Sequence, residues 1–381
     1  MHRGGCQVSG VEPATREADL VPPHREPSGR FFNPSMPMEQ RPAPVERARR
    51  ELWYRSIEDT MDQSAIRVGI SSCLLGSPVR FDGGHKLDRY LRDTLGAFVE
   101  WIPVCPEVEY GLPVPREALR LVGDPQDPRL VTARTGVDHT AGMKAWAARR
   151  LDALERDDLC GFVFKSRSPS SGMRQVKVYP PGVGIPSHAG AGIFARAFME
   201  RFALLPVEDE GRLNDPGLRE GFIERLFVVS RWKRYRREDG TAGGLVAFHT
   251  DHKLLVMAHS PRHYAALGRL AAGAGAQGRR PSSALLDAYL VALLEGLRLA
   301  ATTAKHTNVL QHAAGYFKRL LTTAEKAELA ETIDSFRRGL LPLIVPVTLL
   351  AHYTRVYGEP WLARQHYLQQ HPRELMLRNH V

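Results

Sequence analysis

The chain has 381 residues, which suits one large domain or two ordinary ones, and its 43% hydrophobic content is sufficient for a packed core. Lysine and arginine number 52 against 42 aspartates and glutamates, and this formal net charge of +10 favours a polyanionic partner unless it only reflects a basic proteome. Four irregularly spaced cysteines, with no long apolar run and no signal-peptide core, argue against a secreted disulfide framework and a membrane span, so we expect a cytoplasmic protein.

Residues 1–63 differ from the rest of the chain. They are rich in proline, arginine and glutamate and have no sustained hydrophobic period, so we predict that they are disordered. Met61 stands just before the first expected strand, so this segment is either a tail or a mis-assigned start. Cys6 lies within it and is given no role.

Residues 64–205 alternate between strand and helix patterns. Short apolar runs predict strands at 66–71, 98–104, 160–165 and 176–180. Amphipathic patterns predict helices over 86–96, 141–156 and 193–202. This alternation is typical of an α/β domain, Rossmann-like, with a mainly parallel sheet covered by helices on both faces. Residues 206–217, with two prolines and two glycines, are interpreted as a connector.

Residues 218–381 are dominated by helical patterns, at 246–260, 282–321, 324–339 and 345–358. Leucines at 286, 290, 293 and 297 form one apolar stripe, as expected of core packing. Thr322 and Glu325 have the spacing of a capping box. We therefore predict an all-α second domain.

Three loops follow strand-like runs. Cys73 follows IRVGIS, Cys105 follows FVEWIPV, and KSRSPSSGM (165–173) follows CGFVF. In an open parallel sheet, ligands bind beyond the carboxyl ends of the strands, so these loops are expected to meet in space. The sequence therefore indicates a reactive or metal-ligating pair of cysteines. Burial of each cysteine as a small hydrophobic residue is the alternative.

Three motifs in this order carry a family resemblance. CLLGSPVRFDGGHK (73–86), VCPEVEYGLPVPRE (104–117) and KSRSPSSGM make residues 66–202 resemble the thiouracil desulfurase family. In the helical half, FHTDHK (248–253), KHTNVLQHAAGYFK (305–318) and YLQQHPRELMLRNH (367–380) resemble a domain often fused behind it. The pairing resembles two-domain RNA 4-thiouridine desulfidases.

The resemblance implies a 4Fe–4S cluster held by three cysteines, with the fourth iron open to the sulfur of a thiocarbonyl while water attacks its carbon. Iron is thiophilic and polarises the bond as a Lewis acid. The matching positions are Cys73, Cys105 and Ser171, and Ser171 stands where the family has cysteine. A serine hydroxyl is a poor ligand for a soft cluster. Cys160 begins its strand, roughly 17 Å from residue 171, so we expect a buried strand cysteine there. Water, a substrate group or a partner's thiolate are other candidates for the third position.

Further candidates lie in the same motifs. Ser168 matches a family serine that is expected to contact the substrate. Glu107 is a candidate general base, or a carboxylate that stabilises its turn. Asp82 is expected to hold either a backbone amide or the substrate. Lys165 is expected to place a positive charge beside the cluster, with a surface lysine as the equal alternative.

The helical half contains SRWKRYRR (230–237), in which cations alternate with aromatic residues. Cations bind phosphates and aromatic rings stack on bases, so this segment is interpreted as an RNA contact, with a solvated charged face as the alternative. His249, His252 and His259 share a helix face, and structural or RNA-contacting roles are favoured over a metal site. The predicted RNA-binding residues are Arg231, Trp232, Lys233, Arg234, Tyr235, Arg236, Lys305 and Lys318.

The leading hypothesis is an iron–sulfur-dependent desulfidase that converts 4-thiouridine in RNA, with tRNA as the expected substrate, to uridine. Because Ser171 replaces a cluster cysteine, a non-catalytic protein that binds RNA or a thiolated base is the second hypothesis. The third is a free-base thiouracil desulfurase. The sequence does not indicate an oligomeric state.

Overall fold

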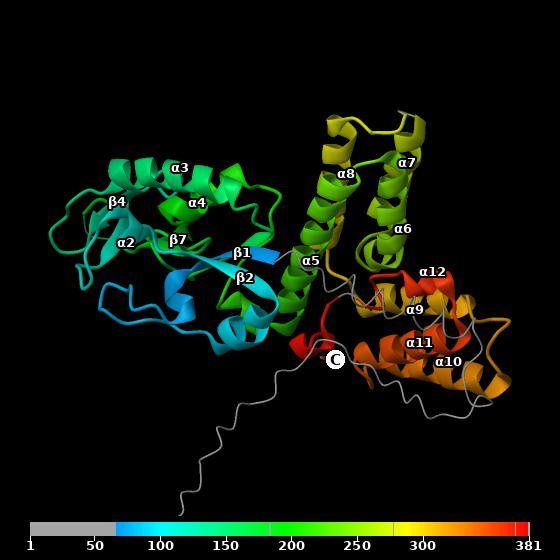
Figure 1. The fold of residues 1–381 in the computed structure, drawn as a ribbon. Coiled ribbons are helices and arrows are strands. Elements are labelled where there is room, and N and C mark those ends of the chain that lie inside the picture. Colours follow the sequence, from blue (N-terminus) through cyan, green and yellow to red (C-terminus); the bar gives the residue numbers. More distant parts are fainter. Residues whose placement is uncertain (1–65, 183, 277, 370, 380–381) are drawn as a thin grey trace, which may run out of the picture. The chain divides into compact units, whose positions relative to one another are not determined.

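The structure is a computed structural model that describes residues 66–379, except residues 183, 277 and 370 (Figure 1). The predictions for residues 1–63, including those for Met61 and Cys6, lie outside the described residues.

A four-stranded sheet forms the centre of the first domain. It consists of β1 (Ile66–Ser71), β2 (Val99–Val104), β5 (Gly161–Phe164) and β8 (Val207–Asp209) in the order β2-β1-β5-β8. Every neighbouring pair is parallel, with Val68 opposite both Trp101 and Gly161. The parallel sheet and the α/β class predicted from the sequence are confirmed.

Both faces of this sheet are buried. Phe162 and Phe164 of β5 pack on one face against α3 (Thr140–Arg156) and α4 (Ile193–Arg201). Val163 joins β1 residues on the other face, in a cluster that includes side chains of α5 (Pro216–Glu238). This alternation follows from the two-residue period of a strand. The sheet is therefore packed between two apolar layers, and the carboxyl ends of its strands are left to form a ligand-binding site.

A second sheet, which the sequence did not predict, has the order β4-β3-β6-β7. Its strands are β3 (Leu119–Val122), β4 (Arg129–Thr132), β6 (Val176–Tyr179) and β7 (Ser187–Gly190). β3 and β6 are parallel, and the two outer pairs are antiparallel. The run at 176–180 is thus a strand, as predicted, but it belongs to this mixed sheet.

Two segments differ from the prediction. Residues 86–96 form a π-helical turn, η3 (Tyr90–Thr94), and a 3₁₀ turn, η4 (Leu95–Ala97), where an α-helix was expected. The predicted connector contains β8, which pairs with β5, and a 3₁₀ turn, η5 (Arg212–Asn214). The first sheet therefore extends to Asp209, and α5 begins at Pro216, where the Asp215 side chain accepts a hydrogen bond from the Leu218 amide.

The second domain is helical, as predicted. The helical pattern at 282–321 forms two helices. The second begins after Thr302, because the Thr302 side chain caps it by accepting a hydrogen bond from the Lys305 amide. The capping box of Thr322 and Glu325 is present. No helix among the described residues is long and apolar enough to cross a membrane. After α5, the elements are α6 (Ala242–His259), α7 (Pro261–Ala276), α8 (Ser283–Arg298), α9 (Thr303–Gly315), α10 (Thr323–Arg337), α11 (Ile344–Tyr357), α12 (Pro360–Ala363) and η6 (Arg373–Leu375).

Candidate active site

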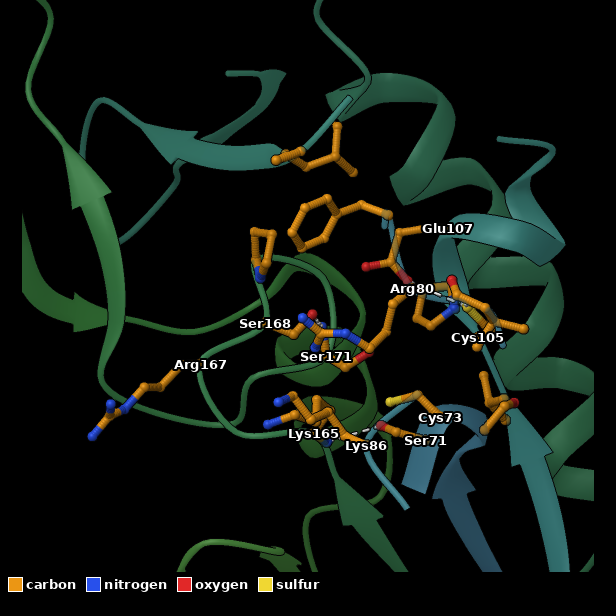
Figure 2. A pocket seen from close by; sticks show the side chains of 18 of the residues that line it. Ser71, Cys73, Arg80, Lys86, Cys105, Glu107, Lys165, Arg167, Ser168 and Ser171 are labelled. Carbon is orange, nitrogen blue, oxygen red and sulfur yellow. Dashed lines mark hydrogen bonds between the residues drawn. The ribbon is translucent and has the colours of Figure 1, made fainter. Parts of the chain in front are cut away.

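The carboxyl ends of three strands converge on one cavity. β1 leads into a 3₁₀ turn, η2 (Ser72–Leu75), which carries Cys73, and β2 leads into Cys105, the N-cap residue of α2 (Pro106–Tyr110). β5 leads into the loop that contains Ser171. These three residues line a cavity of ≈ 290 Å³, and Figure 2 shows them among the side chains of its wall. The strand order reverses at β1, so the cavity lies at the kind of switch point where α/β sheets bind ligands.

Short turns hold the first two loops at the cavity. Gly76 and Gly111 end η2 and α2 with φ of 97° and 112°, a left-handed conformation that favours glycine. The Lys165 amide donates to Ser71 Oγ over 2.9 Å, which ties the end of β5 to the end of β1. The loops are therefore fixed by backbone geometry as well as by the sheet.

The third loop rests on the N-terminus of α4. The amides of Ile193 and Phe194 donate to the carbonyls of Pro169 (3.3 Å) and Ser170 (3.0 Å). These amides have no partner inside the helix, so the loop carbonyls satisfy them. A side chain at Gly192 would place its Cβ only 2.4 Å from the Ser170 carbonyl carbon, so glycine is required for this close approach.

The two cavity cysteines are free thiols and are 8% exposed. Burial raises the pKa of Cys73 to about 11, although the charge of Lys165 opposes the shift. Burial, followed by the Glu107 carboxylate, raises the pKa of Cys105 to about 12. Both thiols are protonated at neutral pH without a metal, and a coordinated metal would displace their protons.

Glu107 is the centre of a hydrogen-bond network at the cavity wall. Its carboxylate accepts from Cys105 Sγ over 3.5 Å and from Ser170 Oγ over 2.5 Å. Ser170 Oγ is also 3.0 Å from Ser168 Oγ, and Arg116 lies 3.9 Å from the carboxylate. Glu107 and Ser168 thus line the same cavity, and their catalytic roles remain predictions. Neither Ser170 nor Arg116 was predicted as a site residue, although both lie within the family motifs.

Ser171 and Cys160 have contrasting positions. Ser171 is 3% exposed, and its amide donates to Ser168 Oγ over 3.1 Å. Among the described residues, its hydroxyl makes no hydrogen bond, although it lines the cavity. Cys160 does not line the cavity and is buried in the apolar cluster beside β1, as expected of a strand cysteine.

Positive charge surrounds the cavity, whose lining includes Arg80, Lys86, Arg116, Lys165 and Arg167. Lys165 does lie beside Cys73, but Glu210 forms an ion pair with it and reduces its effect. Asp82 does not line the cavity. Its exposed carboxylate accepts from the Gly84 amide over 3.0 Å, and this bond lowers its pKa. Asp82 therefore holds a backbone amide in a turn, one of the two roles expected of it, and its assignment as a catalytic residue stays a prediction.

The predicted RNA-binding segment lies largely inside the helical domain. Trp232 and Tyr235 are 3% and 7% exposed, and the Trp232 ring stacks on Tyr289 at 5.4 Å. Arg231 is buried, and its Nε donates to His252 over 3.2 Å. The prediction that these three residues contact RNA is wrong, because they form the inner face of α5.

The other residues predicted to contact RNA differ in their exposure and in their ion pairs. Lys233 forms an ion pair with Asp158 at 2.6 Å, and Lys305 donates to the His259 and Ala300 carbonyls. Arg234 is partly buried, whereas Arg236 and Lys318 are exposed. Only the last two present a largely exposed cation, so for these RNA contact remains a prediction.

The three histidines predicted to share one helix face, His249, His252 and His259, make interior contacts. His249 hydrogen-bonds to Tyr289 (3.1 Å), and His259 pairs with the buried Glu224 (2.7 Å). Burial lowers the pKa of His249 to about 4, so this side chain is neutral at pH 7. Within the described residues, no group of three or more histidines, cysteines and acids forms a metal centre.

Comparison with known proteins finds a separate family match in each half of the chain. Residues 68–210 match the family described as 2-thiouracil desulfurase, and residues 253–372 match a family described as a protein of unknown function, DUF1722. The uncharacterized protein YbgA of Escherichia coli is 33% identical over 155 residues, which are 41% of this chain and 90% of YbgA. A solved structure, the [4Fe-4S]-dependent thiouracil desulfidase TudS, is 32% identical, with 39% of this chain and 93% of that chain covered and a TM-score of 0.33.

The two family matches and the fold define a two-domain protein, in which a desulfurase-type α/β domain precedes a helical one. The chain belongs to the thiouracil desulfurase family, with a DUF1722 domain at its C-terminal side, and is a homologue of YbgA.

Proposed function

We propose that the cavity desulfurises a thiolated pyrimidine. The observation that carries the proposal is the convergence of Cys73, Cys105 and Ser171 on one cavity in a chain of this family. The reaction is a hydrolysis: the carbon–sulfur double bond is replaced by a carbon–oxygen double bond from water, and hydrogen sulfide leaves. It needs no oxidant or reductant.

We further propose that these three residues hold a 4Fe–4S cluster. Two cysteines on neighbouring strand ends supply thiolates, the usual ligands of such clusters. The Ser171 hydroxyl faces the same cavity without a hydrogen-bond partner among the described residues, so it is available as a third donor. Nearby cations, such as Arg80 and Lys86, offset the negative charge of a thiolate-bound centre. When bound, the cluster supplies a thiophilic iron for the substrate sulfur.

The chain's own residues then orient the substrate and accept a proton. Glu107 lies at the cavity wall and is held by Ser170 and Arg116, so its carboxylate is positioned to take a proton from the attacking water. Ser168 lines the cavity two residues from Ser170 and is positioned to donate to a substrate carbonyl or ring nitrogen. Its hydroxyl also keeps the loop closed by accepting from the Ser171 amide.

The proposed substrate is 4-thiouridine within RNA, with tRNA preferred. Support comes from the net charge of +10 and from the cations that line the cavity, which favour a polyanion. Trp232 and Tyr235 give no support through base stacking, because both rings are buried.

The test compares three substrates. Protein purified without oxygen is assayed for sulfide release and for loss of thiocarbonyl absorbance with 4-thiouracil, 4-thiouridine and thiolated tRNA. The proposal predicts turnover in wild type, loss in Cys73→Ser and retention in Cys160→Ser, the matched control outside the cavity. Turnover of the free base alone would exclude RNA as the substrate, and no turnover of any substrate would exclude the desulfidase.

A second function follows from Ser171 in place of the third cysteine. A hard hydroxyl ligand weakens a soft cluster, so the chain is alternatively a protein that binds a thiolated base or RNA without catalysis. The Ser171→Cys variant distinguishes the two. A variant that gains both cluster and turnover, beside a wild type that binds the substrate without converting it, would favour the binding protein.

A further inference from the structure

The helical domain contains a second cavity, which the proposed desulfidation does not use. It lies between α9 and α10, which contact one another, and has a volume of ≈ 350 Å³. None of its lining residues belongs to the cysteine cavity. Small-molecule pockets begin at about 300 Å³, so this cavity is large enough for a small ligand.

The floor of the cavity is apolar. Phe317 and Leu321 line it from the segment after α9, and Leu329 and Ile333 line it from α10. All four belong to the main core cluster of the helical domain, so the cavity reaches into a packed interior. Such a floor favours an alkyl or aromatic group over a polar one.

The mouth of the cavity is basic. Lys318, Lys326 and Arg337 are exposed cations among its lining residues, and Asp334 is the single acid, so the lining carries three positive charges against one negative. Asp334 is occupied by Arg337 at 2.6 Å and by Arg338 at 2.9 Å. Among the described residues, neither lysine forms an ion pair. The two lysines are therefore available to a ligand's negative charge.

We propose that this cavity binds a small carboxylate with an apolar tail. The tail enters between α9 and α10 and contacts Phe317 and Ile333, and the carboxylate lies between Lys318 and Lys326. A cavity of this size accepts a small molecule and excludes a folded partner. The lysines select an anion, because a neutral head group leaves them uncompensated and a cationic head group is repelled.

The experiment uses three probes that share one tail. Decanoate, decanol and decyltrimethylammonium are titrated into the full chain by calorimetry, below their micelle concentrations. Decanoate is expected to bind best, decanol about fivefold more weakly through loss of the ion pairs, and the cation not measurably.

Two pairs of variants locate the site. Ala330 is exposed and lines the cavity, whereas Ala327 is exposed on the same helix and does not. Ala330→Leu is expected to weaken decanoate binding at least tenfold by filling the cavity, and Ala327→Leu to leave it unchanged. Likewise, Lys326→Gln removes one of the two ion pairs and is expected to weaken binding about twofold, whereas Arg319→Gln, at an exposed residue outside the lining, is expected to leave it unchanged.

Several results would overturn the proposal: equal binding of all three probes, no decanoate binding at all, or unchanged affinity in a folded Ala330→Leu variant. A uridine oligonucleotide that binds through Lys318 and is insensitive to Ala330→Leu, with no decanoate binding, would assign this face to phosphate contact. Each of these results is independent of whether the chain desulfurises a thiolated base.

Discussion

The loop that carries Ser171 depends on a glycine far along the chain, and Gly192→Ala tests this dependence. The backbone of Gly192 is extended, at φ −64° and ψ 149°, so alanine meets no conformational barrier there. The obstacle is space. The new Cβ would lie 2.4 Å from the carbonyl carbon and oxygen of Ser170 and 2.8 Å from the Ser171 nitrogen.

The magnitude follows from these distances. An ordinary contact begins at 3.4 Å, so the loop and α4 must separate by about 1 Å. Because the α4 amides are bonded to the carbonyls of Pro169 and Ser170, the shift strains those bonds and displaces Ser171 from the cysteines. Overpacking of this kind costs about 1–3 kcal/mol in the free energy of unfolding. A displacement of about 1 Å in a catalytic group lowers kcat about hundredfold.

The assay combines denaturant unfolding with steady-state desulfidation of 4-thiouridine. Gly273 provides the control, because it lies in α7 with no atom within 4 Å of an added Cβ. Gly273→Ala is expected to stabilise the protein by about 0.5–1 kcal/mol, as replacement of a helical glycine does, and to leave kcat unchanged. If Gly192→Ala retains both wild-type stability and wild-type kcat, the account of the loop is wrong.

Three further predictions test the site and the interior. Because burial disfavours the Cys73 thiolate, iodoacetamide is expected to modify this residue in metal-free protein about hundredfold more slowly at pH 8 than it modifies a cysteine of pKa 9.0. The rate of modification is expected to rise towards pH 11. Mass spectrometry across this pH range measures the rate, and a rate that does not change with pH contradicts the prediction. Glu107→Gln is expected to lower kcat about 10²–10⁴-fold in single-substrate kinetics, and an effect on KM alone would instead assign Glu107 to binding. Trp232→Ala is expected to lower the free energy of unfolding, measured in urea, by about 3–5 kcal/mol, whereas Arg236→Ala, at an exposed residue, is expected to lower it by about 0.5 kcal/mol or less. If Trp232→Ala lowers RNA affinity without lowering stability, Trp232 is an RNA contact after all.

The convergence of the strand ends could be predicted because it follows from short, local stretches of sequence. Apolar runs mark β1, β2 and β5, and parallel pairing alone brings the residues after them, Cys73, Cys105 and Ser171, to one edge. The role of Ser170 could not be predicted in this way. Its neighbour Ser171 has the same side chain, and only the fold brings Ser170 to a carboxylate 63 residues away.

The second sheet was missed for a different reason. β7 reads SHAG and is half exposed, so it lacks the alternation of apolar residues that identifies a strand. Its pairing with β6 comes from the tertiary fold.

The segment around Trp232 is rich in basic residues, and its charge alone favours a phosphate-binding surface over a buried face. Val228, Trp232 and Tyr235 recur at helical intervals, and this period indicated a buried face within a basic sequence.

The central claim is that Cys73 and Cys105 hold an iron–sulfur centre, and iron and sulfide quantification after anaerobic reconstitution tests it most directly. The account predicts about four irons per chain in wild type and in Cys160→Ala, and almost none in Cys73→Ala or Cys105→Ala. Equal iron content in all four proteins, or none in wild type, would contradict it.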